Sequence, residues 1–131
     1  MPTLQSAPMS EDAKTLIDKA VRTFLDEVPA LKPLTLVVGI DLHGRGDTQQ
    51  FRLEMPAVDV RKDIGADARV RVEMRREFFN AMVEHEAKVP DWREAFLNGQ
   101  AKATGIDQYL RLIATVVERQ EERNRTRKAR R

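Results

Sequence analysis

The spacing of apolar residues changes several times along this chain, and these changes restrict the fold more than any other feature. Apolar residues recur at helical spacing over residues 13–28 and again after residue 77, but they alternate with polar residues over 34–55 and 68–74. Because helices flank a group of strands, the pattern predicts an α+β fold. Its sheet is expected to be largely antiparallel and covered on one side by helices.

Capping and turn residues set the boundaries of these elements. Ser10 is expected to begin a helix that runs to Val28. Pro29 and Pro33 are then expected to force an extended connection, and the glycines within residues 43–47 favour a hairpin turn. We expect strands at residues 34–42, 50–55, 58–61, 68–74 and 100–104, and further helices over 78–87, over 90–98 and after residue 105.

The composition excludes several classes of protein. The chain has 131 residues, of which 41% are apolar and 34% charged, so we expect one globular domain. No apolar run approaches the roughly 20 residues of a membrane-spanning helix, and no signal peptide is recognisable, so we expect a cytoplasmic protein. There is no cysteine, and the only serines are Ser6 and Ser10. A serine or cysteine triad is therefore not expected, and we predict neither an enzyme nor a bound cofactor.

Positive charge is concentrated at the C-terminus. The net charge is +2, but the segment from Arg119 onward carries seven basic residues against Glu121 and Glu122, which leaves −3 on the rest of the chain. A solvated helix end is the ordinary explanation, and attraction to an anionic membrane surface is a second one. Nucleic-acid binding is disfavoured because the body of the chain is acidic. The residues available for a membrane contact are Arg123, Arg125, Arg127, Lys128, Arg130 and Arg131.

Three short motifs have ordinary structural explanations. Residues 45–47 spell a cell-adhesion tripeptide (RGD) but lie in the expected hairpin turn. Residues 84–86 (EHE) offer metal-ligating atoms, yet consecutive helical residues point in different directions. Asp41, His43 and Asp47 could meet around the turn and hold a cation, although nothing in the pattern requires one. We therefore predict no metal site.

Bulky apolar side chains are concentrated after residue 77, on three expected helices that face one sheet. There they form either part of a closed core or the wall of a pocket for an apolar ligand. The residues that we expect to line such a pocket are Phe78, Phe79, Met82, Trp92, Phe96, Tyr109, Leu112, Ile113 and Val116.

The segment from Asp67 to about Val117 resembles the sterol carrier protein family of small lipid-transfer domains. An alternating strand (ADARVRVEM) leads into a helix with paired apolar residues (REFFNAMV), and the block AFLNGQAKATG follows. The residues of that block that match the family pattern are Ala95, Phe96, Gly99, Lys102 and Gly105.

This resemblance implies a five-stranded sheet with helices over one face, enclosing an apolar tunnel for a sterol, a fatty acyl chain or a phospholipid. The domain would span residues 10–120, between a flexible leader at residues 1–9 and a basic tail at residues 121–131. The family usually carries larger aliphatic residues where this chain has Ala101 and Ala103. Smaller side chains leave space, which either neighbours such as Trp92 and Tyr109 fill or which widens the cavity. We expect the second, with both alanines lining the cavity.

The resemblance therefore predicts the non-covalent binding and carriage of a lipid, fatty acyl or sterol-like ligand. The alternative is a non-catalytic accessory subunit that presents a hydrophobic substrate to a partner enzyme. Transfer of lipid between vesicles would favour the first function. Co-purification with an enzyme, without such transfer, would favour the second.

Overall fold

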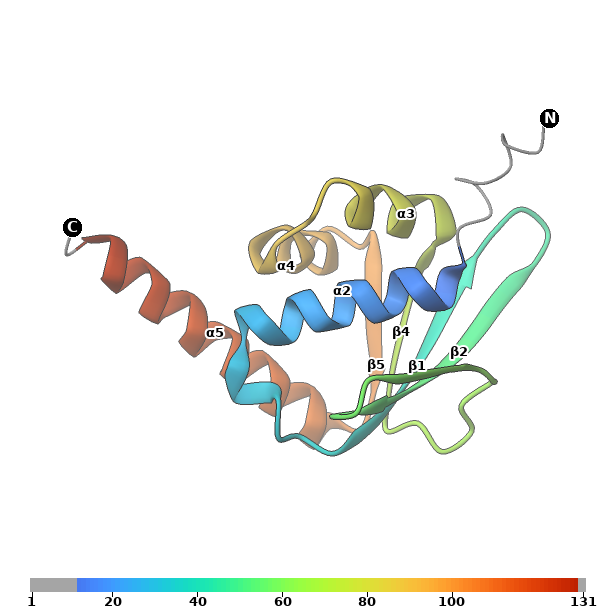
Figure 1. The fold of residues 1–131 in the computed structure, drawn as a ribbon, viewed down its shortest axis with the longest axis horizontal. Coiled ribbons are helices and arrows are strands. Elements are labelled where there is room, and N and C mark those ends of the chain that lie inside the picture. The colour runs from blue at the N-terminus through green and yellow to red at the C-terminus, as the bar shows by residue number, and fades with distance from the viewer. Residues whose placement is uncertain (1–11, 130–131) are drawn as a thin grey trace.

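The computed structural model describes residues 12–129, so the expected leader at residues 1–9 and the expected cap Ser10 lie outside the described residues. The order of helices and strands confirms the predicted α+β fold (Figure 1). The elements are α2 (Ala13–Glu27), the 3₁₀ helix η1 (Pro29–Leu31), β1 (Leu36–His43), β2 (Thr48–Met55), β3 (Asp59–Lys62), β4 (Val70–Arg75), α3 (Arg76–Glu84), α4 (Val89–Leu97), β5 (Ala101–Gly105) and α5 (Asp107–Ala129).

The five strands form one sheet in the order β3-β2-β1-β4-β5. Strand β1 pairs antiparallel with β2, β2 with β3, and β4 with β5, whereas β1 and β4 run parallel. The expected five-stranded, largely antiparallel sheet is therefore confirmed. The parallel pair is a feature that alternation cannot predict, because alternation shows which face a side chain occupies and not which strand lies beside it.

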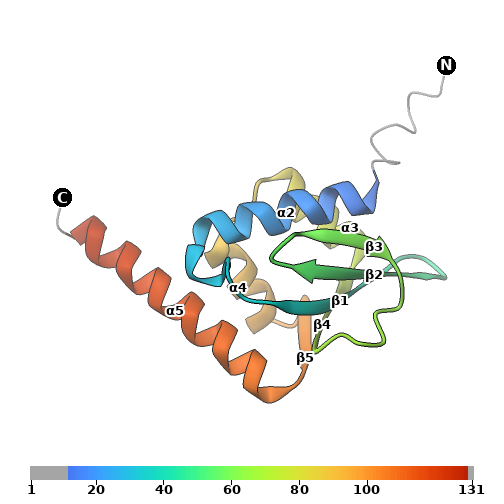
Figure 2. The same cartoon turned by 60° about the horizontal axis from the view of Figure 1, so that its bottom comes forward.

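Helices α2, α3 and α4 lie over one face of the sheet, and the hydrophobic core fills the space between the two layers (Figures 1 and 2). Alternate residues of β1 and β2 point into this core, where Ile40 lies opposite Phe51 and both are buried. Ile17 of α2 and Leu42 of β1 are among the largest fully buried side chains. None of the helices in the described part of the chain has the length and apolarity that crossing a bilayer requires.

Two helix boundaries show how local chemistry sets the chain direction. Asp12 is the N-cap of α2, and its carboxylate accepts a hydrogen bond from the backbone N–H of Lys14 at 3.1 Å. Pro29 begins the short helix η1, so the expected extended connection is wrong at this point. The reason is that the fixed φ of proline suits the first turn of a helix, where its missing N–H is not needed.

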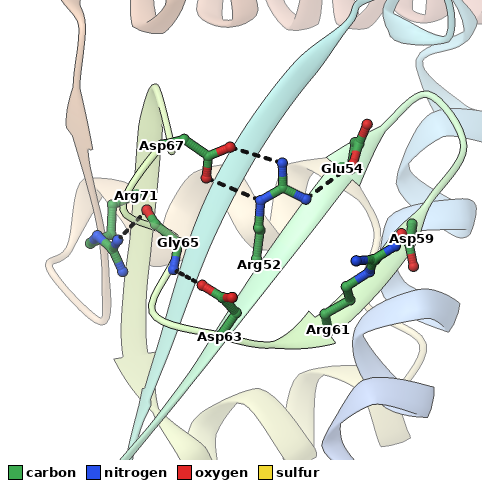
Figure 3. A network of polar contacts seen from close by, with 8 residues as sticks. All are labelled: Arg52, Glu54, Asp59, Arg61, Asp63, Gly65, Asp67 and Arg71. Carbon is green, nitrogen blue, oxygen red and sulfur yellow. Dashed lines mark hydrogen bonds and ion pairs between the residues drawn. The ribbon is translucent and has the colours of Figure 1, made fainter.

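On the opposite face of the sheet, the connection between β3 and β4 folds back over β1 (Figure 3). Arg71 of β4 lies across Gly39 of β1, where an added Cβ would be 2.7 Å from the guanidinium carbon. Nη1 of Arg71 donates to Oδ1 of Asp41 at 2.7 Å, and Nη2 donates to the carbonyl oxygen of Gly65 at 3.0 Å. The absence of a side chain at Gly39 therefore lets Arg71 hold this connection against the sheet.

Arg52 of β2 fastens the same connection at Asp67 (Figure 3). Its Nε and Nη2 donate to the two carboxylate oxygens of Asp67 at 3.0 and 2.8 Å, and Nη1 donates to Glu54 at 3.0 Å. The hydrogen bonds from Arg52 lower the pKa of Asp67, and those to Asp67 and Glu54 raise the pKa of Arg52. Because this face is occupied by polar contacts, an apolar ligand site is expected on the helix side.

Candidate ligand-binding surface at strand β5

Strand β5 is an edge strand of the sheet, and most of its residues are exposed. Ala101 is 1% exposed, but the following residues of the strand are all exposed. Ala103 pairs with Val72 of β4 and points to the same face as Ala101, because side chains alternate along a strand. The helix-covered face of the sheet is therefore left open at Ala103, with the half-buried Val72 beside it.

Gly105 determines how the chain leaves β5. Its φ is +137°, and an added Cβ would lie 2.3 Å from the carbonyl oxygen of Arg69 and 2.8 Å from Cα of Val70. The next residue, Ile106, donates its N–H to the same carbonyl of Arg69 at 2.9 Å. Only glycine fits this close approach, so Gly105 fixes the point from which α5 starts.

Helices α4 and α5 both contact β5. An ion pair joins the two helices, since Nη1 of Arg93 on α4 lies 3.0 Å from Oε1 of Glu121 on α5. The Glu121 side chain is only 11% exposed. Figure 1 shows α5 leaving the end of β5 and extending beyond the rest of the domain. Strand β5 is therefore contacted by two helices that the ion pair links to each other.

The structure places the eleven residues predicted to line a pocket in three environments. Phe79 and Ala101 are buried in the core, and the Phe79 and Trp92 rings have centroids 6.4 Å apart. The half-buried residues pack against this core and are Phe78, Met82, Trp92, Tyr109, Ile113 and Val116. The exposed residues are Phe96, Ala103 and Leu112.

Two of these exposed residues have large apolar side chains, which are usually buried. Phe96 is 38% exposed and Leu112 is 43% exposed. Phe96 lies one turn after Trp92 on α4, and Leu112 lies one turn after Tyr109 on α5, so each exposed residue extends a half-buried one along its helix. We group these residues with Val72 and Ala103 of the two neighbouring strands under the name β5 surface. Its residues are Val72, Trp92, Phe96, Ala103, Tyr109 and Leu112.

An enclosed tunnel is not shown by the described residues. A shallow hollow does lie farther along α5, lined by Glu122, Arg123, Thr126 and Arg127. Near the β5 surface, the guanidinium of Arg69 lies 6.0 Å from the centre of the Tyr109 ring, at cation–π distance. Within residues 12–129, no group of three or more His, Asp or Glu side chains is placed to hold a metal ion. The half-buried and exposed apolar side chains suit contact with an apolar ligand.

Three contributors to this region have no signal in the sequence. Val72 belongs to the apolar alternation of β4 like the strand's other core-facing residues. That it is only half-buried follows from its position beside the exposed Ala103, which the helices leave uncovered. Arg93 and Glu121 are 28 residues apart, so neither helix alone shows that they pair. Only the position of α5 beside α4 brings these charges together.

Comparison with solved structures identifies the fold. A crystal structure of sterol carrier protein 2 like 2 from Aedes aegypti superposes with a TM-score of 0.52 at 17% identity, over 82% of this chain and 98% of that one. The palmitated form of the Aedes aegypti protein, solved in solution, gives 0.53 at 16% identity, over 77% and 93% of the two chains. No protein-family model and no curated protein matches the sequence. At this level of identity the likeness concerns the fold, and the chain has the sterol carrier protein fold.

Proposed function

We propose that this chain binds and carries a hydrophobic lipid or sterol-like ligand without covalent chemistry, and that the ligand lies on the β5 surface. The observation that carries this proposal is the open helix-side face of β5. Ala103 is exposed there, and the large apolar side chains Phe96 and Leu112 remain 38% and 43% exposed on the two adjacent helices.

Apolar contact alone gives a useful affinity. Burial of each methylene group contributes about 0.8 kcal/mol, and loss of ligand and side-chain freedom offsets part of that gain. We therefore expect about micromolar affinity or better for a long acyl chain. The palmitated Aedes aegypti structure makes a fatty acyl chain the first ligand to test.

The two alanines of β5 lie in different surroundings. Ala101 is buried opposite Met74, so it belongs to the closed part of the core. Ala103 is exposed opposite Val72, and a larger aliphatic residue there would cover the floor of the β5 surface. The proposed wider site therefore depends on Ala103 more than on Ala101.

Neighbouring residues of β5 provide a matched experiment. Ala103→Glu places a carboxylate on the helix-side face, whereas Thr104→Glu places the same group on the opposite face of the same exposed strand. A carboxylate in an apolar contact must lose its hydration. We expect Ala103→Glu to weaken binding of a fluorescent fatty acid by about tenfold or more, with Thr104→Glu within about twofold of the unaltered protein.

The two variants separate the possible outcomes. Equal weakening in both would place the ligand elsewhere, and no binding by the unaltered protein would reject carriage of a fatty acid. Circular dichroism checks that both variants keep the fold. Binding without transfer between vesicles, together with a co-purifying enzyme, would favour the accessory-subunit function.

A further inference from the structure

We propose that one face of α5 is a docking surface for an anionic lipid bilayer. This docking face consists of an apolar part followed by a basic part along the same side of the helix. Its residues are Tyr109, Leu112, Val116, Arg119, Arg123 and Arg127. The inference rests on the proposed function, because docking there would bring the β5 surface, which shares Tyr109 and Leu112, to the source of its ligand.

Helix geometry places these six residues on one face. They are separated by steps of three or four residues, which lie above one another on an α-helix. The first half of α5 packs on the domain, whereas the second half extends beyond it (Figures 1 and 2). Gln120 is still buried and Glu121 is paired with Arg93, but no apolar residue occurs between Val117 and Ala129. Apolar packing therefore does not explain why the helix continues beyond Glu121.

The arginines of the docking face are not neutralised by carboxylates within residues 12–129. Arg123 donates to the side-chain oxygen of Gln120 at 2.9 Å, and Arg127 donates to that of Asn124 at 3.3 Å, so both partners are uncharged amides. Elsewhere on α5, Arg111 is paired with Asp107 at 2.7 Å.

Three arginines at successive i, i+4 positions repel one another. A layer of lipid phosphate and carboxylate groups would relieve this repulsion, and each arginine would gain attraction to the anionic surface. The shallow hollow on α5 is lined by Arg123 and Arg127 together with Thr126 and Glu122. Its two cations outnumber its one carboxylate, which favours an anionic group as the occupant.

The apolar part of the docking face favours a bilayer over a nucleic acid. Leu112 is 43% exposed and lies on α5 between Tyr109 and the basic part of the docking face. The guanidinium of Arg69 lies 6.0 Å from the centre of the Tyr109 ring. An exposed leucine with cations on both sides matches the boundary between acyl chains and charged headgroups. A phosphate backbone would engage the arginines alone.

The opposite side of α5 supplies a charge-matched control. Arg123→Gln with Arg127→Gln removes two positive charges from the docking face. Arg125→Gln with Lys128→Gln removes two from elsewhere on the exposed end of the same helix, and Arg125 lies about 160° around the axis from Arg123. Binding is measured by co-sedimentation of the full chain with phosphatidylcholine vesicles containing about 30% phosphatidylserine, at about 0.15 M salt.

We expect the Arg123/Arg127 pair of substitutions to weaken vesicle binding by about 25-fold, from about fivefold per arginine. The Arg125/Lys128 pair is expected to weaken it by about threefold or less, because its side chains point away from the surface. Arg119 lies before the last turns of α5, so its substitution tests the docking face without fraying the end of the helix. We expect Arg119→Gln to weaken vesicle binding about fivefold.

Equal loss in the two double variants would overturn the proposal, because it would show that overall charge matters and orientation does not. Absence of vesicle binding by the unaltered chain, or stronger binding to duplex DNA than to vesicles, would also overturn it. Uptake of a fluorescent fatty acid without vesicles is expected to be unchanged in all three variants. Failure of that uptake in the unaltered chain would reject the proposed function separately.

Discussion

Gly105 gives the most direct test of how the β5 surface is built. Gly105→Ala would place a Cβ 2.3 Å from the carbonyl oxygen of Arg69 and 2.8 Å from Cα of Val70, both backbone atoms that cannot rotate away. It would also hold a non-glycine residue at φ +137°, which costs about 1–3 kcal/mol. If the resulting shift breaks the hydrogen bond from Ile106 to Arg69, about 0.5–1.5 kcal/mol more is lost.

Gly99 is the matched control because it also has a positive φ, of +83°, but no atom lies within 4 Å of the position that a Cβ would take. Gly99→Ala therefore carries only the backbone cost of about 1–2 kcal/mol. We expect Gly105→Ala to lower the free energy of unfolding by about 2 kcal/mol more than Gly99→Ala. For a chain of this length that difference corresponds to roughly 5–10 °C in Tm.

Urea denaturation followed by circular dichroism measures both variants, and the free energies are compared at equal slope. Equal destabilisation of the two variants would show that the close approach of Gly105 to Arg69 contributes nothing beyond backbone conformation, contrary to this expectation. A folded Gly105→Ala protein is also expected to bind a fluorescent fatty acid less tightly, since the start of α5 forms one wall of the β5 surface.

Two further predictions concern the core and the outer face. Ala101→Leu inserts three carbon atoms where the residue is 1% exposed, and overpacking should cost about 1–3 kcal/mol in urea denaturation; unchanged stability would mean that space is available there. Arg52 lowers the pKa of Asp67 from its usual 3.8, so this pairing stabilises the fold above that pH and its contribution is lost as the pH falls through the lowered value. Asp67→Asn should therefore lose less stability than the unaltered chain as the pH falls below about 4, and equal acid sensitivity would contradict this assignment.

The sequence predicted the strand faces well because alternation directly reports which side chains meet the core. Ile40 and Phe51 are buried as the alternation indicates, while Asp41 and Arg71 form their ion pair on the other face. The need for a glycine at residue 39 could not be predicted. A side chain there would collide with the guanidinium of Arg71 on another strand, and spacing along one strand contains no such information.

The openness of the candidate site could not be predicted from residue type. Ala101 and Ala103 are identical residues on one face of one strand, yet the first is buried and the second is exposed. Their difference depends on where α4 and α5 cross the strand. The ion pair between Arg93 and Glu121 joins those two helices across 28 residues of sequence, so local patterns give no sign of it.

Native mass spectrometry of the freshly purified chain shows whether the fold holds a lipid, because it weighs any ligand that remains bound. The proposed function predicts a non-covalent adduct with the mass of a lipid, released as the collision energy rises and reduced in Ala103→Glu but not in Thr104→Glu. A spectrum containing only the free chain, together with no uptake of fluorescent fatty acid in solution, would contradict the claim that this fold carries a lipid here.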